Sequence, residues 1–239
     1  MYKKISEIIL LGFSPGSISN ITETAFQSFG CKNYKIIKNI DLPDDDIPFI
    51  HEHFSCNLYR LEEIQKDHPE KFDFLNVHFG VNHSHIRPVI FEEFKKKLNI
   101  NKNNYLSIIH PTSVFSMSSS HNEGFFAEEL SIVSSFCEIG FGVNIKRGSS
   151  IGHHSKIGDY VSLNPGATLS GFITIGEGTE IGTGATVLHN VTIGKNCLIG
   201  AGSVVTKDIP DGMIAYGNPC SVVRENERWM KTQQLLQRI

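Results

Sequence analysis

Aliphatic residues recur at every sixth position through the second half of the chain. The run is Val133, Ile139, Ile145, Ile151, Ile157, Leu163, Leu169, Ile175, Ile181, Val187, Ile193, Ile199 and Val205. Neither the 3.6-residue period of a helix nor the two-residue period of a simple strand produces this spacing. A six-residue period is typical of a parallel β-solenoid. We therefore expect each hexad to form one side of a triangular coil, with regular hexads over residues 133–210.

Two further positions of the hexad are restricted. Glycine often follows the aliphatic residue directly, as at Gly140, Gly152, Gly158, Gly176, Gly182, Gly194 and Gly200. Small or β-branched residues stand four positions after it, as at Val143, Ser149, Ser155, Val161, Ala167, Ile173, Thr179, Ala185, Val191 and Ser203. We expect the aliphatic side chain to point inward with the small one beside it, and the glycine to permit the turn to the next side.

The first ~105 residues lack the repeat and alternate two local patterns. Strands are predicted at 8–11, 34–40 and 74–79, and helices from the loop 12–17 through Phe29, over 58–65, and from His85 onward. Alternating strands and helices favour a parallel α/β sheet, so residues 1–108 are predicted to form a Rossmann-like domain. The loop contains Gly12, Ser14 and Gly16; it fits either a phosphate site at the start of a helix or a plain tight turn.

Residues 109–239 form the second predicted domain, which begins at Ile109-His110-Pro111. The polar stretch 116–124 is out of register, so it is expected to be a loop ahead of the regular coils. Gly217-Asn218-Pro219 predicts a turn, and 222–239 a closing helix. We expect this tail, 217–239, to cover the exposed sheet edge at the end of the solenoid.

The amino-acid composition argues against nucleic acid and membrane as partners. The 239 residues carry a formal charge of −3 and are 40% hydrophobic, and no basic block suggests nucleic acid. The densest basic run, Lys95–Lys97, fits a solvated helix face. The apolar run Ile8–Leu11 is too short for a membrane span or a signal sequence. Five scattered cysteines without metal-ligand spacing predict reduced thiols and a cytoplasmic protein.

Histidines within the repeat are the candidate catalytic residues. His153 and His189 share one slot of the hexad and differ by 36 residues, or two coils, which puts their backbones about 10 Å apart. Gly171 holds the same slot on the coil between them. An imidazole beside an exposed amide could serve as general base and oxyanion donor. The alternative is that both histidines are exposed turn residues without a role.

At these residues the chain resembles bacterial sugar acyltransferases of the left-handed β-helix class. Gly152-His153-His154-Ser155 and Asn164-Pro165-Gly166-Ala167 are similar to the active-site coil of that class. Gly200-Ala201-Gly202-Ser203 and Gly217-Asn218-Pro219 are similar to its coenzyme A end. The N-terminal half resembles the subgroup that N-acetylates UDP- or GDP-linked 4-amino sugars, a layout shared with sialic acid O-acetyltransferases.

The resemblance implies an acetyl-CoA-dependent N-acetyltransferase that needs no metal and makes precursors of surface glycans. His153 would be the general base and Gly171 the oxyanion donor. It also implies a homotrimer with active sites at subunit interfaces. Residues along the coenzyme A groove would be Gly182, Gly200, Ala201 and Lys207, and those around the nucleotide would be Gly12, Ser14, Gly16, Asp41 and Asn82.

The sequence departs from the family pattern at three places. His154 stands where the family has an Asp or Glu that orients the base, so no negative charge is supplied there. Ser162 replaces a further histidine. Pro15 removes one N–H donor from the first loop. A hydroxyl acceptor relies more on the base than an amine does, so the missing carboxylate favours an amine.

Three alternatives stay open. The first is O-acetylation of a sugar or sialic acid. The second is a γ-class carbonic anhydrase, which needs three histidines around a metal, whereas adjacent His153 and His154 would project to different sides of a strand. The third is a non-catalytic solenoid that serves as a scaffold or binds sugars.

Overall fold

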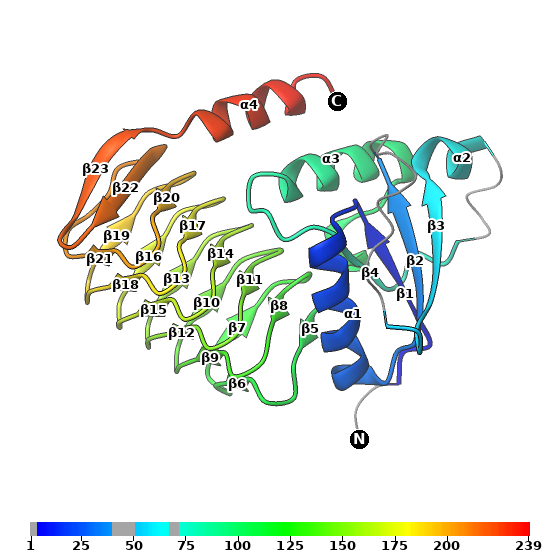
Figure 1. The fold of residues 1–239 in the computed structure, drawn as a ribbon, viewed down its shortest axis with the longest axis horizontal. Helices are drawn as coiled ribbons and strands as arrows, with labels where there is room; N and C mark the ends of the chain where they lie inside the picture. Colours follow the sequence, from blue (N-terminus) through cyan, green and yellow to red (C-terminus); the bar gives the residue numbers. More distant parts are fainter. Residues whose placement is uncertain (1–3, 40–50, 67–71) are drawn as a thin grey trace.

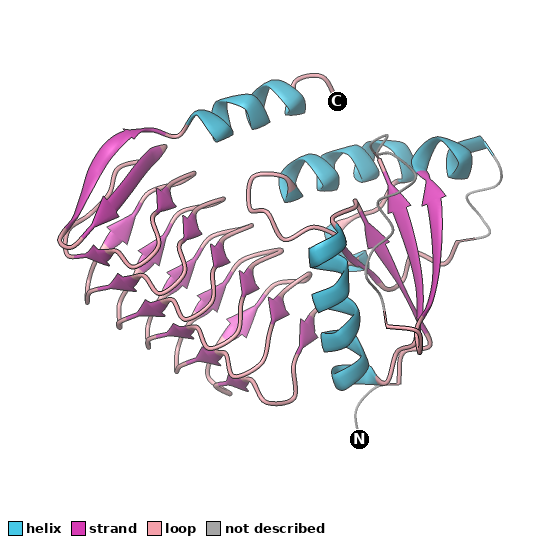
Figure 2. Cartoon of the chain, in the orientation of Figure 1, coloured by secondary structure: helices cyan, strands magenta, loops and turns pink. Residues whose placement is uncertain are grey.

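The computed structural model describes residues 4–39, 51–66 and 72–239. Its N-terminal part is a four-stranded parallel sheet with strand order β3-β2-β1-β4. The strands are β1 (Glu7–Leu11), β2 (Asn33–Lys38), β3 (Ser55–Arg60) and β4 (Val77–Phe79). The helices are α1 (Pro15–Phe29), α2 (Leu61–Lys66) and α3 (Arg87–Leu98), followed by the 3₁₀ helix η2 (Lys102–Asn104). α1 packs on one face of the sheet and α2 and α3 on the other (Figures 1 and 2).

The second part is a parallel β-helix whose coils stack along the long axis of the molecule (Figure 1). Its six-stranded face contains β6 (Val114–Phe115), β9 (Ile132–Val133), β12 (Ser150–Ile151), β15 (Thr168–Leu169), β18 (Thr186–Val187) and β21 (Val204–Val205). Its five-stranded face contains β7 (Ser120–His121), β10 (Glu138–Ile139), β13 (Lys156–Ile157), β16 (Thr174–Ile175) and β19 (Thr192–Ile193).

The third side is the eight-stranded face, against which the N-terminal domain packs. It contains β5 (Ile108–Ile109), β8 (Phe126–Ala127), β11 (Asn144–Ile145), β14 (Ser162–Leu163), β17 (Glu180–Ile181), β20 (Leu198–Ile199), β22 (Met213–Gly217) and β23 (Cys220–Glu225). Strand partners in successive coils are 18 residues apart, as Ile139 and Ile157 are. The triangular coil of three hexads is thus confirmed.

The inward column of the coils is the predicted one. All 13 aliphatic residues from Val133 to Val205 are at most 3% exposed and share one core. Full burial of one such side chain contributes about 1.5–3 kcal/mol, so the column is the main source of stability in this half. Some of the small residues four positions after the aliphatic one carry hydroxyls, which donate to backbone carbonyls of the turns. Ser155 Oγ donates to Gly152 O at 2.7 Å, and Thr179 Oγ1 to Gly194 O at 2.7 Å.

The glycines that directly follow the aliphatic residues have a different cause from the one expected. The left-handed backbone lies three residues after the aliphatic position, for example at His154 (φ 58°) and Tyr160 (φ 59°). The glycine directly after the aliphatic residue is required by the closeness of the next coil. A Cβ on Gly152 would lie 2.4 Å from the carbonyl carbon of Ser170, and one on Gly176 would lie 2.4 Å from the nitrogen of Lys195.

One prediction about the coils is wrong. Residues 116–124 are not a loop ahead of the coils, because β7 lies within them and pairs with β10. The coils already start at β5. The repeat is hidden at this point because His121 occupies the inward strand position, where its ring stacks on Phe125 at 5.1 Å.

The tail and one N-terminal segment also differ from expectation. Residues 213–225 form an antiparallel hairpin around the predicted turn, and only α4 (Glu227–Leu236) is helical. α4 returns along the coils to contact α3 instead of covering the solenoid end (Figure 1). Trp229 anchors it: a Cβ on Gly178 would lie 2.1 Å from the indole.

The predicted helix 58–65 begins only at Leu61, because β3 extends to Arg60.

No helix among the described residues is long and apolar enough to cross a membrane.

Candidate active site

The candidate base and oxyanion donor lie in contact on one edge of the prism. We call the turns that join the six-stranded to the five-stranded face the histidine edge. His153 is exposed there, and its ring lies against Gly171 of the next coil. A Cβ on Gly171 would approach His153 Cε1 to 2.7 Å and Nε2 to 2.8 Å. A side chain at 171 would therefore force the imidazole to move.

The backbone N–H of Gly171 is not used by the coils. The neighbouring Phe172 N–H donates to His153 O at 2.8 Å, and Gly171 O accepts from Asn190 N–H at 3.3 Å. Within the described structure Gly171 N–H itself has no hydrogen-bond partner. Gly171 is buried and His153 is exposed, so an unpaired amide donor lies beside a ring that is open to solvent.

His154 is held against His153 by a stack of aromatic rings. The two Nδ1 atoms are 3.1 Å apart, so one ring donates a hydrogen bond to the other. The His154 ring stacks on Phe172 at 4.8 Å and 12°, and lies 4.9 Å from Phe136 on its other side. These three residues occupy one slot at 18-residue intervals. That spacing was available in the sequence, although the role of the phenylalanines was not recognised from it.

His189 completes the edge. Its ring centroid is 6.5 Å from that of His153 and 5.3 Å from that of Phe172. The rings approach more closely than backbones two coils apart because Gly171, in the coil between them, has no side chain. Within the described residues no carboxylate forms an ion pair with these histidines.

The residues expected along the coenzyme A groove are divided between two edges. Lys207 is exposed and follows β21, so it continues the histidine edge. Gly182, Gly200 and Ala201 lie in the turns between the eight-stranded and six-stranded faces, which we call the glycine edge. Within one chain, therefore, these three residues are not on the edge that carries His153.

The N-terminal residues expected to bind nucleotide are closely packed. Gly12 (φ 83°) donates its N–H to Ile37 O at 2.9 Å, and a Cβ on it would lie 2.9 Å from Ile90 Cδ1. Ser14 caps no backbone amide but accepts a bond from Ser17 Oγ at 3.0 Å. Gly16 lies in the first turn of α1 with open space around its Cα. Asp41 is outside the described residues.

Asn82 and Arg87 form the junction between the two domains. Asn82 is 8% exposed, and its side-chain amide lies 2.9 Å from that of Asn144. Arg87 is fully buried and donates to Asn82 O, Tyr160 O and Ser162 Oγ. Burial lowers the pKa of the guanidinium to about 9. Arg87 thus faces the coils.

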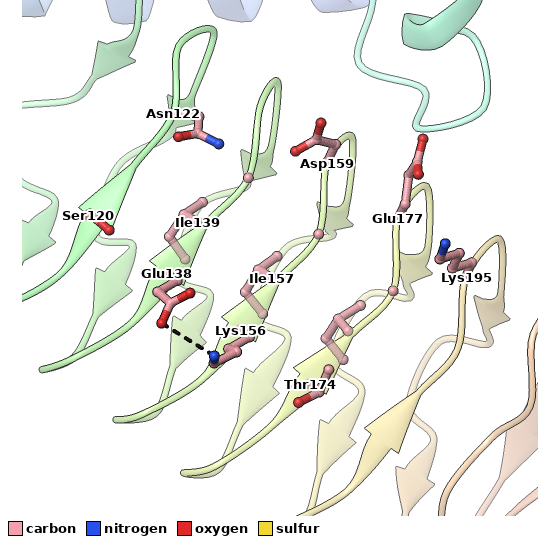
Figure 3. A pocket seen from close by; sticks show the side chains of 14 residues that line it. Ser120, Asn122, Glu138, Ile139, Lys156, Ile157, Asp159, Thr174, Glu177 and Lys195 are labelled. Atoms are coloured by element: carbon pink, nitrogen blue, oxygen red, sulfur yellow. Dashed lines mark ion pairs between the residues drawn. The ribbon is translucent and has the colours of Figure 1, made fainter.

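A hollow of about 590 Å³ runs along the five-stranded face (Figure 3). Its charges are largely paired: Lys156 lies 3.5 Å from Glu138, and Asp159 lies 2.8 Å from Lys102. Glu177 and Lys195 line its far side (Figure 3). It is an open surface, and none of the histidines of the histidine edge lines it. Among the described residues no three His, Cys, Asp or Glu side chains gather as metal ligands.

Known transferases share the architecture of this chain. Residues 172–207 match the family model for the bacterial transferase hexapeptide, with six repeats. The acetyltransferase domain of PglB from Neisseria gonorrhoeae, solved with acetyl coenzyme A, is 25% identical with a TM-score of 0.71; the match covers 92% of this chain and 100% of that one. No curated protein sequence gives a significant match.

Two more distant structures share the fold. A variant of GDP-perosamine N-acetyl transferase from Caulobacter crescentus, solved with CoA and GDP-perosamine, is 20% identical with a TM-score of 0.73 and coverage of 92% and 98%. WeeI from Acinetobacter baumannii is 21% identical, with a TM-score of 0.70 and coverage of 92% and 100%. The expected fold, a Rossmann-like domain followed by a left-handed parallel β-helix, is confirmed, as is the resemblance to hexapeptide acyltransferases.

Proposed function

We propose that the protein is an acetyl-CoA-dependent N-acetyltransferase that acts on a UDP- or GDP-linked amino sugar destined for surface glycans. The observation that carries the proposal is the contact between His153 and Gly171 on an exposed edge of a transferase-type β-helix. A thioester is already activated toward an amine, so the protein needs only a base, an oxyanion donor and correct positioning. No metal enters this reaction. The five free cysteines suit a cytoplasmic location.

Each residue of the histidine edge has one task in this mechanism. His153 Nε2 takes a proton from the sugar amine as the nitrogen attacks the thioester carbonyl carbon. The Gly171 N–H donates to the oxyanion that forms. The C–S bond then breaks, and the departing thiolate of coenzyme A accepts the proton that His153 holds. The amide product and free thiol balance the reaction.

His154 would set the tautomer of the base. For Nε2 of His153 to be free, its Nδ1 must carry the proton and donate it to Nδ1 of His154, 3.1 Å away. Stacking on Phe172 fixes the plane of the accepting ring. We infer that a neutral, immobilised imidazole performs here the orienting task that a carboxylate performs in the family.

An oligomer would complete the site. The N-terminal domain packs on the eight-stranded face, whereas the histidine edge is where the other two faces meet, on the opposite side of the prism. Nucleotide and base can therefore meet only between copies. Apolar side chains on and beside the six-stranded face, Val114 (59% exposed), Leu130 (67%) and Ile132 (42%), suit self-association there.

We propose a homotrimer packed through these faces. In such a ring the histidine edge of one copy would face the glycine edge of the next. This arrangement would bring Gly182, Gly200 and Ala201 of one copy opposite Lys207 and His153 of its neighbour, with coenzyme A between them. Sedimentation of the purified protein tests the stoichiometry directly.

The first experiment measures free-thiol release from acetyl-CoA with UDP-, GDP- and dTDP-linked amino sugars and their parent hydroxy sugars. Release with an amino sugar alone supports the proposal. Release with a hydroxy sugar alone supports an O-acetyltransferase instead. Failure to bind acetyl-CoA at all supports a non-catalytic solenoid.

His153→Ala tests the base. We expect turnover to fall by about 10²–10⁴-fold, the usual contribution of a general base, while acetyl-CoA binding is kept. His53→Ala is the matched control, since His53 is an exposed histidine before β3 in the N-terminal domain, away from both edges of the coils. Full turnover by His153→Ala would remove His153 from the mechanism.

A further inference from the structure

His189 is a histidine of the histidine edge to which the mechanism above gives no task. It stands in the slot of His153 two coils further on, with Gly171 between the two and Lys207 one coil beyond. Its side chain is exposed, and within the described residues its ring makes aromatic contacts but no hydrogen bond or ion pair. Both of its ring nitrogens can therefore bind a substrate atom or carry a proton.

The rings of His153 and His189 lean toward each other across Gly171. Backbones two coils apart are separated by about 10 Å, whereas the two ring centroids are 6.5 Å apart. Phe172 packs against both rings at steep angles, with its centroid 5.2 Å from that of His153 and 5.3 Å from that of His189. The missing side chain of Gly171 leaves the gap between the rings open, since a Cβ there would lie 2.7 Å from His153 Cε1.

His189 lies on the side of this gap from which coenzyme A would leave. In the proposed function the thioester oxygen faces the Gly171 N–H, and the coenzyme extends along the edge toward Lys207. The slot recurs every 18 residues, so His189 lies between Gly171 and Lys207. The reacting carbon would therefore have the amine and His153 on one side, and the sulfur and His189 on the other.

We propose that His189 is a further catalytic residue, which relays the proton to the sulfur as the thioester is cleaved. The proposal rests on the proposed function, in which it specifies how the proton reaches the leaving group. When the C–S bond breaks, sulfur keeps the bonding electrons and receives the N–H proton of one ring nitrogen of His189. The other ring nitrogen accepts the proton that His153 took from the amine. One proton thus moves from nitrogen to sulfur, and both rings end neutral.

The way in which His153 is held explains why a relay is needed. Its Nδ1 lies 3.1 Å from Nδ1 of His154, whose ring is stacked on Phe172. His153 cannot turn its Nε2 from the amine to the sulfur without breaking that hydrogen bond. No hydrogen bond joins His153 to His189 directly, and a gap of this size on an exposed edge admits one bridging water molecule.

Two variants of His189 separate proton transfer from packing, measured with acetyl-CoA and the amino sugar that the wild type accepts. His189→Phe keeps a ring beside Phe172 but carries no proton, and His189→Ala removes the ring. We expect both to lower kcat about 100-fold, at the low end for acid–base groups because a thiolate leaves readily, with KM for acetyl-CoA within about twofold of the wild type. Added imidazole should restore turnover to His189→Ala but not to His189→Phe, whose ring occupies the space. His53→Ala is again the control.

Three outcomes would overturn the relay while leaving the proposed function intact. Full turnover by His189→Phe would show that the ring serves packing alone. A raised KM for acetyl-CoA with unchanged kcat would show that His189 holds the coenzyme. Loss of turnover in His189→Ala that imidazole cannot restore would show that no proton passes through this position. A wild type that binds acetyl-CoA but transfers nothing to any amino sugar contradicts the proposed function, and the relay with it.

Discussion

The two halves of the molecule place their neighbours by different means. In the β-helix, residues 18 positions apart are always partners, as Ser150 and Thr168 are, so the sequence period fixes the tertiary contacts. In the N-terminal domain the neighbours depend on crossovers: β1 lies between β2 and β4, which come from distant segments. In a repeat, therefore, tertiary contacts can be predicted from the sequence. In an α/β sheet the sequence predicts only the individual strands and helices. Chemistry that lies between the halves is the hardest to infer.

The largest expected effect breaks the connection between the halves at Arg87. Arg87→Met removes the guanidinium donor from Asn82 O, Tyr160 O and Ser162 Oγ, of which Asn82 O and Ser162 Oγ keep the 3.3 Å bond between them. A hydrogen bond to a charged group contributes about 1.5–3 kcal/mol, so we expect the free energy of unfolding to fall by about 3 kcal/mol or more. Urea denaturation followed by circular dichroism measures it.

The control for this change is on the same helix. Lys95→Met removes an exposed cation 3.9 Å from Glu92, which should change stability by less than about 1 kcal/mol. If Arg87→Met is no less stable than Lys95→Met, the two halves are held together by apolar packing alone, and the buried guanidinium is dispensable.

The next change tests whether the repeat positions the chemistry as well as the fold. In Gly171→Ala the new methyl would lie 2.7 Å from His153 Cε1, so the ring must move. Displacing a base and crowding the oxyanion donor should reduce kcat about 100-fold, with the coils intact. Ser135→Ala, in the same slot two coils earlier, is the control. Should His153→Ala lose as much activity with alanine at 171 as with glycine, the two residues act independently.

The sequence predicted the coils residue by residue wherever the inward slot was aliphatic. It failed at His121 because a histidine can fill that slot when aromatic neighbours, here Phe115 and Phe125, surround it. It failed at 222–225 because a hairpin is stabilised by its partner strand and not by local propensity. The candidate pair His153 and Gly171 was predictable, since slot and coil determine their contact.

A cavity of about 320 Å³ beneath α4 was not predictable, because no local pattern encodes it. Its residues Asn39, Glu93 and Leu235 come from three elements that only the finished fold brings together. The aromatic clamp on His154 was accessible in principle, because Phe136 and Phe172 lie 18 residues on either side of it. A regular period thus reveals contacts within the coils but none between the coils and other parts of the chain.

The acid sensitivity of the N-terminal domain offers a third test. Burial lowers the pKa of His78 to about 4, although its Nδ1 bonds Leu106 O at 2.9 Å. The folded state therefore keeps His78 neutral, whereas the unfolded chain binds a proton below about pH 6.5. The stability that depends on neutral His78 is complete above that pH and falls as the pH drops toward 4. At pH 5 the loss should be about 2 kcal/mol.

Unfolding of the wild type and of His78→Asn at pH 7 and pH 5 checks this value. Asparagine can still donate to Leu106 O but does not titrate, so the variant should lose less stability between the two pH values. His83 and His85, whose pKa values burial also lowers, contribute equally to both proteins. An equal loss in the two proteins would show that His78 is not the acid-sensitive group.

The smallest expected effect concerns the residue by which this chain departs from its family. Asn and Asp both tolerate the left-handed backbone of His154, and both can accept the Nδ1–H of His153. They differ only in charge. His154→Asn should keep turnover within about threefold, whereas His154→Asp should move the acidic limb of the pH profile upward by up to about one unit, because a negative charge favours the protonated imidazole. Identical profiles for the two variants would mean that position 154 does not act on the base, and that the aromatic stack serves the packing of the coils alone.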